Sequence, residues 1–129
     1  MLVHCYGHDV VINPGDSSYQ VVNEAVNSTL SGSKRWDQLS LSDVTYAEYQ
    51  TSPNMMVMEL SYDPPARIHS FYMFFKNVDT MIIPLDGRHA SINTVFGRLR
   101  GYNEAGSLHV ATSQPILDAL EREDICRKE

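Results

Sequence analysis

Lysine is scarce in this sequence, and positive charge as a whole is outweighed by negative charge. Only three lysines stand among 10 basic residues, against 16 acidic residues, and the formal net charge is −6 at pH 7. A protein that binds DNA or RNA gathers Lys and Arg on one face to neutralise phosphates. Arg98 and Arg100 share one face of an expected strand, but Glu104 lies close to them. The sequence therefore predicts no nucleic-acid partner.

Long apolar runs are missing as well. No stretch approaches the roughly 20 apolar residues that cross a bilayer as a helix, and the first residues lack the pattern of a signal peptide. We therefore expect no membrane insertion by this segment. The few lysines and the many Ser, Asn and Tyr residues favour an extracytoplasmic location over a cytoplasmic one. The chain is then expected to be the extracytoplasmic part of a membrane-anchored protein.

Cysteine is nearly absent, since the chain has only Cys5 and Cys126, at its opposite ends. A bridge between them would close a very long loop and strongly restrict the unfolded chain. Small domains that depend on disulfides usually carry more cysteines than this. We therefore expect two free thiols, with a Cys5–Cys126 bridge as the alternative.

The chain does have the size and composition of a packed protein. Of its 129 residues, 43% are hydrophobic and 20% are charged. Chains of this length usually form one domain, and this balance of residue types does not favour disorder. Residues 1–129 are therefore expected to form a single domain with its own core.

Helical periodicity is present in two regions. The range 17–31 places Val22, Val26 and Leu30 on one face at helical spacing. A shorter helix is expected to begin near Pro115, where the missing N–H of a proline in the first turn costs nothing. The sequence thus predicts a long N-terminal helix and a short C-terminal helix.

Most of the remaining chain is typical of strands. The adjacent prolines of Asp63-Pro64-Pro65 are expected to interrupt them, because proline removes backbone donors. No strand–helix–strand repetition demands a parallel sheet. The sequence predicts an α+β fold, in which a curved antiparallel sheet of about six to seven strands carries the long helix on one face. The expected strands are Leu2 to Ile12, Val44 to Tyr49, Met55 to Tyr62, Arg67 to Phe75, Thr80 to Leu85, Ile92 to Arg100 and Ser107 to Ala111.

Metal-binding residue types gather near the N-terminus, at His4, Cys5 and His8. On one continuous strand, His4 and His8 would share a face about 13 Å apart while Cys5 points away. A metal site here would need a bulge at Gly7, so an edge strand is the favoured interpretation and no cofactor is expected. A second metal hypothesis requires the other histidines to converge, namely His69, His89 and His109.

No motif for a phosphate loop, a nucleophile elbow or a zinc protease is present. The run Phe71 to Phe75 is apolar on both faces, which exceeds what one small core would cover. We therefore favour a non-catalytic binding or regulatory domain that acts through a protein partner or through self-association. Its expected interface consists of Phe71, Met73 and Phe75.

The alternative is a small ligand-binding protein or enzyme, with a pocket between residues 17–31 and the sheet. Arg88 and His89 are candidate ligand-binding residues too, because a guanidinium and an imidazole in one loop can bind an anion or move a proton. No residue is assigned a catalytic role, and a non-enzymatic function is favoured. The expected lining of the pocket is Tyr46, Tyr72, Phe96 and Arg98.

Overall fold

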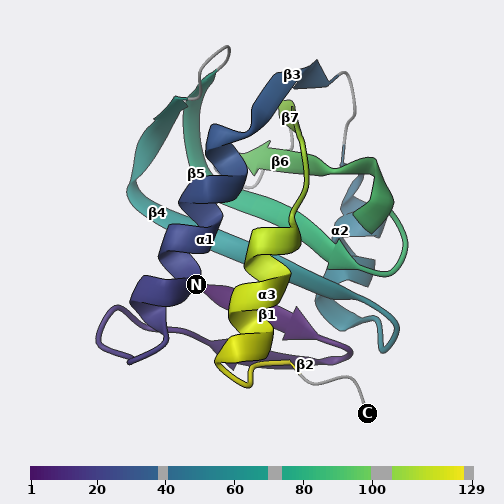
Figure 1. Cartoon of the computed structure of the whole chain (residues 1–129). Helices are drawn as coiled ribbons and strands as arrows, with labels where there is room; N and C mark the ends of the chain where they lie inside the picture. Colours follow the sequence, from purple (N-terminus) through teal and green to yellow (C-terminus); the bar gives the residue numbers. More distant parts are fainter. Residues whose placement is uncertain (38–40, 70–73, 100–105, 127–129) are drawn as a thin grey trace.

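The computed structural model describes residues 1–37, 41–69, 74–99 and 106–126, and for residues 33–37, 63–69 and 74–77 it describes the backbone. Figure 1 shows a sheet with helices on both of its faces. In chain order the elements are β1 (Leu2–Cys5), β2 (His8–Val11), α1 (Tyr19–Ser31), β3 (Ser33–Asp37), α2 (Asp43–Thr51), β4 (Met56–His69), β5 (Phe74–Asp86), the 3-10 helix η1 (Ala90–Ile92), β6 (Thr94–Arg98), β7 (Ser107–Val110) and α3 (Gln114–Arg122).

The seven strands form one sheet in the order β2-β1-β4-β5-β6-β7-β3, and every neighbouring pair runs antiparallel. This confirms the predicted α+β class with an antiparallel sheet. The strand order is not the order of the sequence, because β1 lies between β2 and β4 and because β3 pairs with β7. β2 and β3 are therefore the two edge strands.

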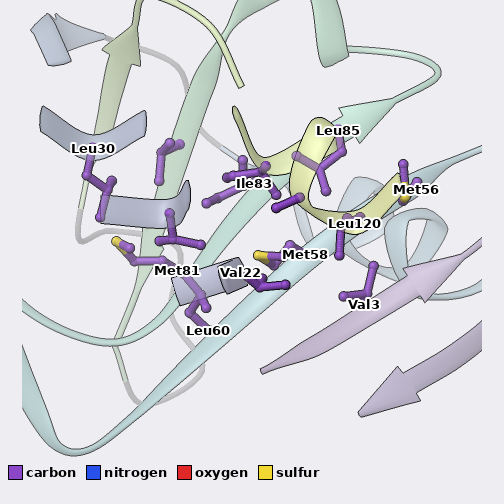
Figure 2. Packing of buried hydrophobic residues seen from close by; sticks show 14 of the residues in the cluster. Val3, Val22, Leu30, Met56, Met58, Leu60, Met81, Ile83, Leu85 and Leu120 are labelled. Atoms are coloured by element: carbon purple, nitrogen blue, oxygen red, sulfur yellow. The ribbon is translucent and has the colours of Figure 1, made fainter. Parts of the chain in front are cut away.

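The main core lies between the sheet and the two helices α1 and α3. Side chains from β4 and β5 point toward these helices, with Met58 and Met81 close to Val22 of α1 (Figure 2). All three are fully buried, and the cluster also contains Leu120 of α3. The two predicted helices, α1 and α3, therefore both pack on this face of the sheet with their apolar sides.

The opposite face of the sheet is covered by α2, which Figure 1 shows behind the strands. Successive residues of a strand point to opposite faces, so Val57 faces α2 whereas Met58 faces α1. Val57 packs with Ile82 and Phe96 and with Tyr49 of α2 in a second apolar cluster. The sheet is thus covered on both faces.

The two predicted helices lie close to their expected positions. α1 begins at Tyr19 rather than at residue 17, and α3 carries Pro115 in its first turn, as predicted.

None of the helices in the described part of the chain is long and apolar enough to cross a bilayer.

The predicted strand Val44 to Tyr49 is wrong, because this segment forms α2. The side chain of Ser42 caps the helix by accepting a hydrogen bond from the Thr45 N–H, at 3.1 Å. Val44, a residue typical of strands, is 72% exposed, while Tyr49 is buried. Helix capping and burial at helical spacing outweigh the weak strand preference of Val and Tyr here.

The predicted strand Leu2 to Ile12 is a hairpin of two strands, β1 and β2. Tyr6 and Gly7 connect them with φ values of 51° and 96°. Positive φ at both residues is what a two-residue type I′ turn requires. The turn reverses the chain and makes β2 an edge strand of the sheet.

The prolines of Asp63-Pro64-Pro65 do not end the strand, because β4 continues through them to His69. The register with β5 shifts between Ser61 and Ala66, which lets the chain pass two residues that lack a backbone N–H. The predicted strand Arg67 to Phe75 therefore corresponds to the end of β4 and the start of β5.

The expectation of free thiols is also wrong, since Cys5 and Cys126 form a disulfide with a Cα–Cα distance of 5.2 Å. Cys5 lies in β1 and is fully buried, whereas Cys126 follows α3. Sequence separation alone did not reveal that the end of α3 returns to β1. The bridge ties the C-terminal region to β1, the inner strand of the edge hairpin.

Loss of this bridge is expected to lower stability strongly, because its two cysteines are 121 residues apart. The chain-entropy relation predicts a loss of up to about 5 kcal/mol for a loop of this length. Urea unfolding of the Cys126→Ala variant, which leaves the buried Cys5 in place, measures it. Reduced wild-type protein should show the same loss, and a difference below about 1 kcal/mol in both samples would contradict the assignment.

Candidate functional site

A cluster of ionisable side chains lies between the sheet and α2, and we call it the His4 network: His4, Asp9, Tyr46, Glu59 and Arg98. His4 of β1 and Glu59 of β4 are only 3% and 6% exposed. His4 Nδ1 lies 2.7 Å from an oxygen of Asp9 on β2, and His4 Nε2 contacts an oxygen of Glu59. Strand alternation places these side chains on the α2 face, because Val3 and Cys5 of β1 pack toward α1.

The contacts of His4 define its protonation state. Both ring nitrogens of His4 meet carboxylate oxygens, and an ionised carboxylate can only accept hydrogen bonds. Only the imidazolium form carries an N–H on both nitrogens. The geometry therefore describes a positively charged His4 that donates one hydrogen bond to Asp9 and one to Glu59.

The pKa shifts agree with this assignment. Burial alone would lower the pKa of His4, but the hydrogen bonds and negative charges of Glu59 and Asp9 outweigh burial and raise that pKa above 6.5. Burial alone would raise the pKa of Glu59, but hydrogen bonds from His4 and Tyr46 and the charges of His4 and Arg98 lower that pKa below 4.5. Each partner thus favours the charged form of the other.

Tyr46 connects the network to α2. Its hydroxyl donates a hydrogen bond to the second oxygen of Glu59, and the guanidinium carbon of Arg98 lies 3.7 Å from the centre of its ring. Burial, followed by the hydrogen bond to Glu59, raises the pKa of Tyr46 to about 12, so the phenol remains a donor at neutral pH. The helix is therefore held on the sheet by charged partners as well as by apolar packing.

Three residues of the predicted pocket lining, Tyr46, Phe96 and Arg98, do come together, but on the α2 face. Tyr46 packs against the cluster that contains Phe96, which is 4% exposed. The space between α1 and the sheet, where the pocket was expected, is occupied by the buried apolar side chains of the main core (Figure 2). The fourth predicted residue, Tyr72, lies outside the described residues.

The outer edge of β2 is a second feature of this region. Met1 and Ile12 exchange two hydrogen bonds across the hairpin: the N-terminal amine of Met1 donates to the Ile12 carbonyl at 3.0 Å, and the Ile12 N–H donates to the Met1 carbonyl at 2.8 Å. In an antiparallel pair such bonded positions alternate with positions whose N–H and C=O point away. Asp9 and Val11 occupy the alternate positions, so their backbone groups point outward.

Exposure supports this description of the edge. Val11 is 59% exposed, and the Asp9 side chain is 54% exposed even though it contacts His4. No other segment of the described chain hydrogen-bonds to the outward backbone groups of β2. The edge thus presents two N–H donors and two C=O acceptors beside an exposed valine.

Arg88 and His89, the other predicted ligand-binding residues, lie at the far end of α2. His89 Nδ1 and the Tyr49 hydroxyl share a hydrogen bond of 2.8 Å, and Arg88 forms an exposed ion pair of 2.9 Å with Glu48. Gly87 precedes them with a φ of 93°, and a Cβ there would approach the Asn54 carbonyl oxygen to 2.6 Å. Glycine is therefore needed for this turn, which holds Arg88 and His89 against α2.

The hairpin turns His4 away from the other two metal candidates, Cys5 and His8. Cys5 pairs with His8 in register, so His8 shares the face of Cys5 and His4 faces the other way. The expectation that His4 and His8 share a face is therefore wrong, and Cys5 is bonded to Cys126. Within the described part of the chain, no group of three or more His, Cys, Asp or Glu residues can hold a metal ion.

The predicted interface residues are not brought to a described surface. Phe71 and Met73 lie outside the described residues. Phe75 belongs to β5, an inner strand between β4 and β6, and only its backbone is described. Their role as an interface stays a prediction.

Sequence reasoning missed Glu59 and Asp9, although Glu59 leaves a signal. It is the one acidic residue inside the apolar run from Met55 to Leu60. A charged side chain in a buried strand needs an oppositely charged or hydrogen-bonding partner. Its partner His4 is 55 residues away in the sequence. No local pattern connects the two.

Comparison with known proteins finds no matching family model, no matching curated protein and no matching solved structure.

The His4–Glu59 pair predicts a pH-dependent stability. Because the pKa of His4 is raised on folding, its contribution to the free energy of unfolding is complete below pH 6.5. That contribution is lost as the pH rises through the folded-state pKa of His4. A lowered pKa makes the contribution of Glu59 complete above 4.5 and lost as pH falls through its folded-state pKa. The destabilisation caused by Glu59→Gln is therefore expected to be largest between pH 4.5 and pH 6.5, where both contributions are complete. The expected loss is about 3 kcal/mol, because the substitution leaves the buried charge of His4 without its main partner.

Urea unfolding of wild type and Glu59→Gln across this pH range measures the effect, with NMR titration of the His4 ring as a second measurement. The matched control is Glu48→Gln, since Glu48 pairs with Arg88 on the surface and such pairs contribute about 0–1 kcal/mol. A loss for Glu59→Gln that does not vary with pH would show that His4 is not the charged partner.

The two tyrosines of α2, the partly buried Tyr46 and the buried Tyr49, provide a matched comparison. Tyr46→Phe removes a hydrogen bond to a carboxylate and is expected to cost about 2 kcal/mol, whereas Tyr49→Phe removes one to an imidazole and should cost about 1 kcal/mol. Thermal unfolding of both variants at pH 6 tests the order. Equal losses, or a larger loss for Tyr49→Phe, would contradict the assigned role of Glu59 as a charged acceptor.

Proposed function

We propose that this chain is a non-catalytic binding domain whose protein partner adds a β-strand to the outer edge of β2. The observation that carries the proposal is the outward direction of the Asp9 and Val11 backbone groups on an edge strand. An extended peptide can pair with such an edge through main-chain hydrogen bonds, while exposed side chains such as Val11 supply selectivity.

The edge is held in place before any partner arrives. The Asp9 side chain bonds to His4, which is itself anchored to Glu59 on β4. Cys5, the residue that precedes the hairpin turn, is bonded to Cys126. A preformed edge loses less conformational freedom on binding, and this favours affinity.

The disulfide supports an extracytoplasmic location, because such bonds form and persist in oxidising compartments. Cys5 is fully buried, which makes its sulfur hard for a reductant to reach. This location stays part of the proposal, together with the membrane-anchored parent protein expected from the sequence.

A small-molecule binder or enzyme is the second candidate. One observation favours it: the His4 network combines buried ionisable groups whose pKa values are shifted, and such groups concentrate at functional sites. Against catalysis, both nitrogens of His4 are engaged by carboxylates and its ring is buried, so it cannot take a proton from a substrate in this arrangement. A metabolite screen by thermal shift, with binding lost in Tyr46→Phe, would put this candidate first.

Strand addition predicts a specific mutational result. Val11→Pro removes an outward N–H without removing any hydrogen bond to β1, because proline is tolerated where the N–H faces solvent. Binding of peptides selected from a displayed library of extended hexapeptides is expected to weaken about five- to tenfold, which corresponds to the loss of one main-chain hydrogen bond. Calorimetry of wild type and variant measures the change.

Val11→Thr is the matched control, since it keeps the N–H and a β-branched side chain of similar size. It should bind within about threefold of wild type, because the main chain contributes most of the affinity in this mode. Amide hydrogen exchange should show protection of Asp9 and Val11 in the complex. A library that yields no binder protected at these two amides would refute strand addition at β2.

A further inference from the structure

We propose that the strand added to β2 is β2 of a second copy of this chain, paired antiparallel about a two-fold axis that passes through Val10. This inference rests on the proposed function and names its partner. A two-fold contact uses the same surface on both copies, so the edge must be complementary to itself. The backbone pattern of β2 meets that requirement in one register.

The alternation of backbone groups limits the registers. In a ladder between two β2 strands, the outward groups of one copy must face outward groups of the other, and these belong to Asp9 and Val11. The two-fold axis must therefore pass through a residue rather than between two residues, since otherwise an outward position would face an inward one. Within the edge, this leaves axes through Asp9, Val10 or Val11.

Only the axis through Val10 pairs all the outward N–H and C=O groups of both copies. There, Asp9 of one copy faces Val11 of the other, and the reverse, so that two bonded pairs use all four outward positions. An axis through Asp9 would place two carboxylates directly opposite each other, which is unfavourable. An axis through Val11 would place Asp9 opposite Asn13, whose N–H already donates to the Asp16 side chain at 2.8 Å.

The charges on the edge are compatible with this register. The carboxylate of Asp9 faces a valine and is bonded to His4 at 2.7 Å, so no like charges meet across the new ladder. At longer range the two copies repel each other, because each carries a formal net charge of −6 when its histidines are counted as neutral. Added salt screens this repulsion and should strengthen the dimer.

The contact is small, since β2 has four residues. Interfaces well below the standard size belong to weak or transient complexes. We therefore expect reversible dimers at high protein concentration. A local concentration on a membrane surface or in a multimeric parent protein would increase their population.

Cysteine scanning tests the register directly. Across the axis, the two Val10 residues form a non-hydrogen-bonded pair with a Cα–Cα distance of about 4.5 Å, which allows a disulfide. The two Val11 residues would be about 8 Å apart, from the rise per residue and the strand spacing, which does not. Under mild oxidation with diamide, Val10→Cys should therefore form covalent dimers, while Val11→Cys and His8→Cys should not.

Peptide mapping of the non-reduced product must show an intact Cys5–Cys126 bridge, so that disulfide exchange is not mistaken for dimer formation. Cross-linking of Val11→Cys in preference to Val10→Cys would overturn the proposed register. Equal cross-linking of all three variants would indicate random collision and would overturn the specific dimer.

Sedimentation of proteins without added cysteine tests the affinity. Val11→Pro removes two hydrogen bonds of the dimer, each worth about a factor of five, and should weaken association about twenty-five-fold. Val11→Thr should associate like wild type, and both variants should unfold at a urea midpoint close to that of wild type. Raising the salt concentration should strengthen association of wild type.

The self-pairing inference and the proposed function can fail separately. A wild-type protein that stays monomeric up to millimolar concentration and a Val10→Cys variant that does not cross-link would overturn self-pairing. If the library peptides still bind and Val11→Pro still weakens them, strand addition by another protein stands. If the peptides also fail, both proposals fall.

Discussion

The bond between His4 and Glu59 is the interaction on which most of this architecture depends. It joins β1 to β4 inside the sheet. His4 also bonds to Asp9 on the edge strand, and Glu59 also accepts a hydrogen bond from Tyr46 on α2. Burying an ion pair costs solvation energy that its attraction does not always recover, so such a pair is a weak argument for stability by itself. Its clearer effect is on arrangement, because a charged histidine with two acceptors specifies which strand lies beside which.

The two faces of the sheet are held by different kinds of interaction. The α1 and α3 face is an apolar core of Val, Leu, Ile and Met side chains, with the Cys5–Cys126 bridge at its border. The α2 face combines a small apolar cluster around Val57, Ile82 and Phe96 with the charged network. Protonation changes of His4 and Glu59 therefore act first on the α2 face and on β2.

The proposed function follows from this division of roles. β2 contributes little to either core, and its Val11 and Asp9 side chains are exposed, yet it is held in place by a hairpin turn, an ion pair and a nearby disulfide. Natural proteins usually protect an exposed edge with charge, short length or a covering segment. Here the edge is short and one charge is turned toward His4, which leaves its backbone groups accessible to a second strand.

The sequence alone was sufficient for the α+β class, for the antiparallel sheet and for the helices α1 and α3, because these depend on local periodicity and on turn and cap residues. It misplaced Val44 to Tyr49, where strand preference is weak and burial against the sheet decides. It also could not connect His4 with Glu59, Cys5 with Cys126 or β3 with β7, since each pair is distant along the chain and adjacent only in the folded sheet. Periodicity in the sequence indicates which side of a helix or strand is buried. The order of the strands in the sheet decides which residues it packs against, and the candidate site depends on that order.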